Sequence, residues 1–238
     1  HIGDINDIDS IKKILKKYNP EIVFHLAAQS LVKQSYENPL STLQTNIMGT
    51  ANLLEAIREV DSVKNCIVMT SDKCYKNIET FDAYTEEDPL GGNDPYSASK
   101  GGAEVIVNAY KKSFFQDKHN QQTKIATIRA GNVIGGGDWA PNRIVPDCIE
   151  KFVQNKSVEI RNPNAVRPFQ YVLEPISGML CLAEKMWDNE SFDESWNIGP
   201  LVSDTPQQIH TIVEKIIEKW GSGTWKDISN KQSFKESN

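Results

Sequence analysis

The stretch Glu21-Ile22-Val23-Phe24-His25-Leu26 is an apolar run of strand length. Such a run is typical of a strand that is buried in a parallel sheet. On its amino-terminal side, apolar residues recur at helical spacing from Ile8 to Tyr18, after a possible helix cap at Asp7. The sequence therefore predicts a helix that leads directly into a buried strand.

The same alternation continues toward the carboxyl end. A helical pattern over about residues 39–59 leads to a second apolar strand at residues 66–70. After a long polar loop, a third helix begins at Pro95, a residue that suits the first helical turn, and leads to a strand at residues 124–129. Because strands and helices alternate, we expect an α/β fold with a Rossmann-like, doubly wound parallel sheet.

The pattern is looser beyond residue 135. Helices are expected near residues 145–154, 175–187 and 206–220, and a short strand near residues 158–160. We therefore divide the chain into a large domain, residues 1–135, and a smaller lobe, residues 136–238, which is interleaved with the first. Trp187, Trp196 and Trp220 are expected to pack the smaller lobe.

Composition excludes several classes of function. The chain has 238 residues, a net charge of -6 and no block rich in Lys and Arg, so it lacks the clustered cations that bind nucleic acid or an anionic membrane surface. No apolar stretch approaches the roughly 20 residues of a membrane-spanning helix. We therefore expect no nucleic-acid partner and no membrane partner.

Cysteines and histidines give no sign of a metal site. The four cysteines lack the paired spacing of a zinc site and the density of a disulfide scaffold, so we expect reduced thiols in a cytoplasmic protein. His119 and His210 show no metal-ligand spacing, and His25 lies inside an apolar strand, where a hydrogen-bonded core histidine is expected. The sequence therefore predicts no bound metal.

Ligands of open parallel sheets bind beyond the carboxyl ends of the strands. Small residues, Ala27-Ala28-Gln29, follow the first strand, and Ser71-Asp72-Lys73-Cys74-Tyr75 follows the second. A glycine-rich stretch, residues 130–139, follows the third. Small residues would let a flat cofactor approach the backbone, although polar and glycine-rich loops are also common for reasons of turn formation.

Tyr96 and Lys100 lie one turn apart on one face of the third helix. A lysine ammonium near a phenol favours the phenolate, and the Ser71 hydroxyl could share the hydrogen bond to a substrate alcohol. Together these groups could deprotonate an alcohol while its hydride leaves. A Tyr-x-x-x-Lys pair also occurs by chance on solvated helix faces, so the pair alone assigns no function.

Five stretches match a known family in order along the chain. They are VFHLAAQ at 23–29, TNIMGT at 45–50, TSDKCY at 70–75, PLGGNDPYSASK at 89–100 and RPFQYVLEP at 167–175. On these stretches the sequence resembles the extended short-chain dehydrogenase/reductases, a group of NAD-dependent epimerases and dehydratases. Within that group, the third and fifth stretches resemble the CDP-glucose 4,6-dehydratases.

The resemblance implies a lyase that converts CDP-glucose to CDP-4-keto-6-deoxyglucose in deoxysugar and O-antigen biosynthesis. Bound NAD would take hydride from sugar carbon 4, water would leave across carbons 5 and 6, and hydride would return at carbon 6. The catalytic residues would be Ser71, Tyr96 and Lys100 for oxidation, with Asp72 and Lys73 as acid and base for elimination. Related TDP-glucose dehydratases have glutamate at the second of these positions, and a lysine there must be neutral to act as a base. A loop ion pair between Asp72 and Lys73 would explain the same two residues.

The resemblance also assigns binding residues to the two domains. Those for NAD are Asp4, Ile5, Leu26, Ala27, Ala28, Gln29, Thr45, Tyr96 and Lys100. Those for the nucleotide-sugar substrate are Gln29, Ser30, Asn132, Arg143, Arg167 and Tyr171. Guanidinium groups suit a pyrophosphate, although each arginine could equally be a surface residue. Ser30 stands where many relatives have proline, and Asp4 could equally cap a helix.

Two helices carry apolar stripes that concern the assembly of the protein. The stripes lie on the helices that carry residues 46–56 and 105–110. They imply, by resemblance, the helix-bundle interface of a homodimer, whereas internal packing would explain them equally.

The glycine-rich turn that holds the cofactor pyrophosphate in the family is absent from this sequence. The run Gly135-Gly136-Gly137 cannot replace it, because it follows a late strand. We therefore expect an internal fragment that lacks the first βαβ unit and that by itself binds NAD weakly or not at all.

Two other functions remain open. The first is another nucleotide-sugar epimerase or dehydratase of the same family, for which Lys73 is the discriminating residue, because an epimerase needs no acid and base for elimination. The second is a non-catalytic nucleotide-binding or dimerisation module. The joint presence of Ser71, Asp72, Tyr96 and Lys100 with Lys73 favours an enzyme.

Overall fold

The computed structural model describes residues 1–78, 83–116, 123–188, 190–200 and 207–229. The chain forms two compact units, His1–Ala130 with Pro175–Ile198, and Gly131–Glu174 with Gly199–Asn238. This division differs from the expected boundary at residue 135, because the segment 175–198 returns to the first unit. The sequence pattern placed that segment in the smaller lobe.

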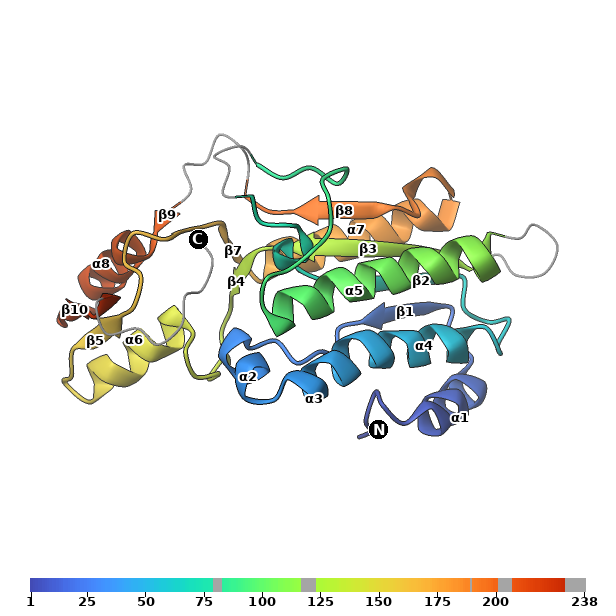
Figure 1. The fold of residues 1–238 in the computed structure, drawn as a ribbon, viewed down its shortest axis with the longest axis horizontal. Coiled ribbons are helices and arrows are strands. Elements are labelled where there is room, and N and C mark those ends of the chain that lie inside the picture. Colours follow the sequence, from blue (N-terminus) through green and yellow to red (C-terminus); the bar gives the residue numbers. More distant parts are fainter. Residues whose placement is uncertain (79–82, 117–122, 189, 201–206, 230–238) are drawn as a thin grey trace. The chain divides into compact units, whose positions relative to one another are not determined.

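The first unit is built on a parallel four-stranded sheet (Figure 1). Its strands, in spatial order, are β1 (Ile22–His25), β2 (Asn65–Met69), β3 (Lys124–Ala130) and β8 (Ser195–Ile198), and each neighbouring pair is parallel. The expected α/β fold with a parallel sheet is thus confirmed. Strand β8 was not expected from the sequence, and its pairing with β3 is the reason that segment 175–198 belongs to this unit.

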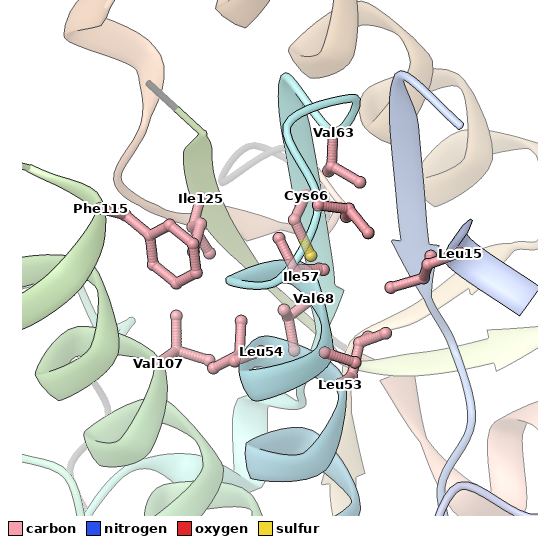
Figure 2. Close-up of a cluster of buried hydrophobic side chains, with 12 residues drawn as sticks. Leu15, Leu53, Leu54, Ile57, Val63, Cys66, Val68, Val107, Phe115 and Ile125 are labelled. Atoms are coloured by element: carbon pink, nitrogen blue, oxygen red, sulfur yellow. The ribbon is translucent and has the colours of Figure 1, made fainter. Parts of the chain in front are cut away.

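Helices cover both faces of this sheet. Helices α1 (Ile8–Tyr18), α4 (Gly49–Ile57) and α5 (Pro95–Tyr110) contribute to one apolar cluster, and α7 (Leu173–Asp188) contributes to another. Figure 2 shows the first cluster, in which Leu54 of α4 and Val107 of α5 lie near Val68 of β2. The neighbouring residue Ile67 packs with Met179 of α7, because successive side chains of a strand point to opposite faces.

The helix expected over residues 39–59 is confirmed, with an interruption. It is composed of α3 (Pro39–Leu43), a π-helical turn η1 (Gln44–Met48) and α4. A short helix, α2 (Val32–Glu37), precedes it. π-helical turns inside α-helices occur frequently at functional sites, so residues 44–48 are of interest below.

The second unit is smaller. Its elements are β4 (Asn132–Ile134), α6 (Ile144–Val153), β5 (Val158–Ile160), β6 (Val166–Arg167), β7 (Phe169–Tyr171), β9 (Gln207–Gln208), α8 (Ile209–Trp220) and β10 (Trp225–Asp227). Its core contains Phe152 and Val213, and Trp220 lies against Phe152. Trp187 and Trp196 instead belong to the first unit. Trp196 packs against the apolar cluster to which α7 contributes. The expectation that these two residues pack the smaller lobe is therefore wrong.

Among the described residues, no helix has the length and apolar character needed to cross a membrane.

Candidate active site

A short turn carries three of the predicted catalytic residues directly after β2. The Ser71 hydroxyl accepts a hydrogen bond from the Lys73 amide at 3.2 Å and donates one to Asp72 Oδ1 at 3.0 Å. Ser71 thereby caps the 3-10 turn η2 (Asp72–Cys74), as serine commonly caps a helix. Asp72 and Lys73 are half-buried at the carboxyl end of the strand, where ligands of parallel sheets bind.

Helix α5 carries the other two predicted catalytic residues. It begins as the sequence predicts, with Pro95 in the first turn and the Asp94 side chain accepting a hydrogen bond from the Ser97 amide at 3.0 Å. Tyr96 and Lys100 are both buried on this helix, and Lys100 Nζ donates a hydrogen bond to the Met69 carbonyl at the end of β2. Lys100 is therefore anchored to Met69, which lies two residues before Ser71 in the chain.

Burial affects the charge of Lys100. Desolvation lowers the pKa of Lys100 to about 8, and the nearby carboxylate of Glu104 opposes that decrease. Below pH 8 the side chain is therefore still mostly an ammonium, which is the form that its predicted role beside a Tyr96 phenolate requires.

Glycine lets α5 lie directly against the turn η2. A Cβ atom at Gly101 would lie 3.2 Å from the Cys74 carbonyl oxygen, which is a tight contact, so the absence of a side chain there favours this close approach. A Cβ atom at Gly92 would lie 2.3 Å from the Ala98 amide, so the segment that precedes α5 can pass its first turn only with glycine at this position. The structure thus brings Ser71, Asp72, Lys73, Tyr96 and Lys100 together in one unit, at the carboxyl end of β2.

The loop after β1 carries four of the nine predicted cofactor residues, Leu26, Ala27, Ala28 and Gln29. Leu26, Ala27 and Ser30 are exposed and Ala28 is half-buried, so the short side chains of the two alanines leave room beside the backbone; Thr45, in η1, is also half-buried. This arrangement fits a flat cofactor that approaches the backbone. The Gln29 side chain is hydrogen-bonded inside the protein, because Nε2 donates to Thr42 Oγ1 on α3 and to the Leu31 carbonyl, and its predicted role in binding stays a prediction.

Asn46, in the π-helical turn η1, ties this loop to α5. Its side chain accepts a hydrogen bond from the Gln29 amide at 2.8 Å, and Asn46 Nδ2 donates to the Gln29 carbonyl and to Ser99 Oγ at 2.8 Å. Asn46 is buried, and sequence reasoning assigned it no role in the site. A polar residue within an apolar helical pattern was the available signal.

Asp4 and Ile5 lie close to α4. The Asp4 carboxylate accepts hydrogen bonds from the backbone and side chain of Asn6, and the Ile5 carbonyl accepts one from Asn52 Nδ2. Helix α1 is capped by Asp7. Asp4 is therefore not the cap of α1, and its predicted role in NAD binding stays a prediction.

His25 is confirmed as a core histidine. It is buried and hydrogen-bonded to Thr50 Oγ1 at 3.0 Å. Burial, with a smaller contribution from the charge of Lys100, lowers the pKa of His25 to about 4. The ring is therefore neutral at pH 7.

The second unit holds four predicted substrate residues. Asn132 of β4 pairs with Phe169 of β7 and is half-buried, whereas Tyr171 is exposed. Arg143 Nη1 forms an ion pair with Asp138 at 2.9 Å, and Arg167 Nη1 donates to the Val166 carbonyl. The four residues thus lie on short strands and loops of one unit.

No group of three or more potential ligands that could hold a metal ion occurs among the described residues, and His119 lies outside them. The cysteines are free thiols, and burial raises the pKa of Cys66, Cys74 and Cys148 to about 12. Buried thiols of this kind are poor nucleophiles.

Sequence reasoning also missed a buried ion pair, Glu104 with Arg129, whose members contact Thr70 and Tyr75 on either side of the turn η2. Two signals were available. Glu104 follows Lys100 by one helical turn, and Arg129 interrupts an apolar strand, where a charge is almost never buried without a partner.

Comparisons with known proteins identify relatives of this chain. The family model described as GDP-mannose 4,6 dehydratase matches residues 1–233. A CDP-glucose 4,6-dehydratase of Salmonella typhimurium is 46% identical over 224 residues, which cover 93% of this chain and 62% of that protein. A dTDP-D-glucose 4,6-dehydratase of Dictyostelium discoideum is 30% identical over 77% of this chain and 43% of that protein. The chain thus spans less than two thirds of the length of these relatives.

Solved structures show the same fold. A UDP-glucose 4-epimerase of Thermotoga maritima aligns with a TM-score of 0.80 and 24% identity over 95% of this chain and 71% of that one. A dTDP-glucose 4,6-dehydratase of Streptomyces venezuelae, solved with NAD bound, aligns with a TM-score of 0.79 and 21% identity over 95% of this chain and 65% of that one. The predicted resemblance to the extended short-chain dehydrogenase/reductases is confirmed. The chain belongs to the GDP-mannose 4,6 dehydratase family.

Proposed function

We propose that the chain carries the catalytic residues of an NAD-dependent nucleotide-sugar 4,6-dehydratase, a hydro-lyase, that acts on CDP-glucose. One observation carries the proposal: the turn with Asp72 and Lys73 lies against the helix with Tyr96 and Lys100. The identity of 46% to a CDP-glucose 4,6-dehydratase supports the choice of nucleotide. The placement of this step in deoxysugar and O-antigen biosynthesis is part of the same proposal.

Oxidation of the sugar would depend on Ser71, Tyr96 and Lys100. The phenolate of Tyr96 accepts the proton of the hydroxyl on sugar carbon 4, and the Ser71 hydroxyl holds that oxygen by a hydrogen bond. The Lys100 ammonium stabilises the phenolate. NAD, when bound, supplies the hydride acceptor at carbon 4 and the hydride donor at carbon 6.

Elimination of water would depend on the turn η2. The ketone at carbon 4 acidifies the hydrogen on carbon 5, so a base must remove that proton and an acid must protonate the departing hydroxyl on carbon 6. Lys73, in its neutral form, is the base in this proposal, and Asp72 is the acid. The departing hydroxyl takes a proton from Asp72 and leaves as water, while Lys73 holds the proton removed from carbon 5. When hydride returns at carbon 6, Lys73 gives a proton back to carbon 5, so no net oxidation of the sugar or of the cofactor remains.

Cofactor and substrate binding are proposed from the residues that match the family. For NAD these are Asp4, Ile5, Leu26, Ala27, Ala28, Gln29, Thr45, Tyr96 and Lys100. For the substrate they are Gln29, Ser30, Asn132, Arg143, Arg167 and Tyr171. In this proposal the two arginines neutralise the pyrophosphate of the nucleotide sugar.

The experiment uses the complete gene product that contains these 238 residues, incubated with CDP-glucose and NAD in deuterated water and followed by NMR. A 4-keto-6-deoxy product with deuterium at carbon 5 is expected. Unchanged CDP-glucose would overturn the proposal. Parallel samples with TDP-glucose, UDP-glucose and GDP-mannose would then identify another substrate, and a 4-epimer without exchange at carbon 5 would indicate an epimerase.

We also propose that the protein is a cytoplasmic homodimer that pairs through α4 and α5. Free thiols suit a reducing compartment. Large apolar side chains are exposed at Met48, beside α4, and at Val105 on α5. Sedimentation of a Val105→Glu variant tests the dimer, with exposed Val153→Glu in the second unit as the control. A shift of only the first variant to monomer is expected, and an unshifted dimer would contradict this interface.

A further inference from the structure

Two residues bracket the catalytic turn, and one buried ion pair contacts both. Thr70 precedes Ser71, and Tyr75 follows Cys74. Glu104 bonds to the Thr70 side chain, and its ion-pair partner Arg129 bonds to the Tyr75 side chain. The mechanism above uses neither member of this pair.

Glu104 lies on α5 and is buried. Its carboxylate accepts four hydrogen bonds from side chains of the sheet and its loops: Thr70 Oγ1 at 2.5 Å, Thr127 Oγ1 at 2.9 Å, Ser195 Oγ at 3.2 Å and Arg129 Nη2 at 2.8 Å. So many donors offset the cost of burying a carboxylate. They also join three elements, because the donors come from β3, from β8 and from the end of β2.

Arg129, on β3, extends the connection to the far end of the turn. Its Nη1 donates to the Tyr75 hydroxyl at 3.0 Å and to the Glu86 carbonyl at 3.0 Å, while its guanidinium carbon lies 5.0 Å from the centroid of the Tyr75 ring. Burial by itself would lower the pKa of Arg129, but hydrogen bonding to Glu104 raises it above its ordinary value. The guanidinium therefore stays charged and holds Glu104, Tyr75 and Glu86 at once.

Tyr75 is held from several directions. Its hydroxyl donates to Asn197 Oδ1 at 2.6 Å, and its ring stacks on Tyr84 at a centroid distance of 5.0 Å. The neighbouring Cys74 carbonyl accepts a hydrogen bond from the Gly91 amide at 2.8 Å. Tyr75, which follows the turn, is therefore held by hydrogen bonds and a stacked ring, just as Thr70, which precedes it, is held by its hydrogen bond to Glu104.

We propose that Glu104 and Arg129 are positioning residues that hold Asp72 and Lys73 in place for elimination by fixing Thr70 and Tyr75 at the two ends of their turn. The link to elimination rests on the proposed function, whereas the positioning of the turn by the ion pair does not depend on it. Glu104 is one helical turn from Lys100, so the same ion pair couples the helix of the oxidation residues to the turn of the elimination residues.

Removal of either charge would leave its partner buried and unpaired, which is expected to unfold the protein. The test therefore uses Tyr75→Phe, which removes only the hydroxyl that Arg129 contacts. Tyr84→Phe is the matched control, because it removes a hydroxyl from the other ring of the stacked pair. That hydroxyl bonds to Ile78 and Asn77 and lies outside the network of Arg129.

The first measurement needs no substrate. Hydrogen exchange of the Cys74 amide, which donates to the Ser71 carbonyl at 3.1 Å, reports opening of the turn. Tyr75→Phe is expected to accelerate this exchange about tenfold, as the loss of a hydrogen bond to a charged group would do, and Tyr84→Phe about twofold or less. Unchanged exchange in Tyr75→Phe would overturn the positioning proposal.

The second measurement separates the two half-reactions in a single turnover of the complete gene product on CDP-glucose. In Tyr75→Phe, elimination is expected to slow about tenfold while hydride transfer changes about twofold or less, so that reduced nicotinamide accumulates. Equal slowing of both steps, or of neither, would contradict the assignment to elimination. An inactive wild-type protein would instead refute the proposed function, and hydrogen exchange would still decide the positioning.

Discussion

The turn that carries Asp72 and Lys73 and the predicted substrate residues of the second unit differ in how they are held. Residues 70–75 follow a central strand and are anchored by buried hydrogen bonds to Glu104 and Arg129, and Lys100 bonds to the carbonyl of Met69, the residue just before them. Arg143 and Arg167 lie on a loop and a two-residue strand, and the ion pair of Arg143 with Asp138 is partly exposed. The residues proposed for catalysis are thus held by the sheet and its buried contacts, whereas the residues proposed to recognise a charged ligand are half-buried arginines outside it.

The strongest test of this contrast is Tyr96→Phe. Loss of the proton acceptor is expected to lower kcat about a thousandfold, within the range for removal of a general base, without loss of folding. The measurement is the initial rate of CDP-glucose conversion. Tyr110→Phe, farther along the same helix, is the control and is expected to retain activity. A small loss in Tyr96→Phe would refute its catalytic role.

Lys73→Met is expected to have the next largest effect. Without a base at carbon 5, elimination is expected to slow about a hundredfold while hydride transfer continues. Deuterium exchange at carbon 5, followed by NMR, is the direct measurement. Lys76→Met is the control, because Lys76 is exposed and lies just beyond the turn. Normal exchange in Lys73→Met would assign the base to another residue and favour a loop ion pair with Asp72.

Substitution in the second unit is expected to change binding instead of the chemical step. Arg143→Met and Arg167→Met are each expected to raise KM about tenfold and to leave kcat nearly unchanged, because a charge-assisted bond to the pyrophosphate is lost. Steady-state kinetics with CDP-glucose separates the two parameters. Lys156→Met, an exposed cation of the same unit, should behave as wild type. A selective fall in kcat would remove the contrast between the two regions.

The smallest effect is the pH dependence due to Lys100. Because burial lowers the pKa of Lys100 to about 8, the ammonium is lost as the pH rises through 8 and the phenolate of Tyr96 loses its stabilising charge. The rate of hydride transfer from carbon 4, measured in a single turnover, is therefore expected to fall by about twofold from pH 7 to pH 8, and further above that. The linkage to stability has the opposite sign, because the unfolded chain binds the extra proton between pH 8 and 10.5, so this group's contribution to folding stability rises with pH there. A rate that is flat up to pH 10 would refute this role of Lys100.

The local sequence pattern predicted some of the helices and strands correctly and failed to predict others. The strand at residues 22–25 and the helix that begins at Pro95 follow from apolar runs and capping residues, which act within a few positions of the chain. Strand β8 was missed because Ser195–Ile198 is short and of mixed polarity, and only its pairing with β3 makes it a strand. The same pairing places Trp196 in the first unit, whereas the sequence pattern assigned it to the smaller lobe.

The sequence by itself determined the α/β alternation, the spacing of Tyr96 and Lys100, and the position of Ser71-Asp72-Lys73 after a strand, because these are properties of neighbours along the chain. Only the tertiary structure decided that Glu104 and Arg129 meet beside that turn, and that Asn46 joins the loop after β1 to α5. Those contacts depend on hydrogen-bonding groups that are far apart in sequence and become partners only when water is excluded from around them.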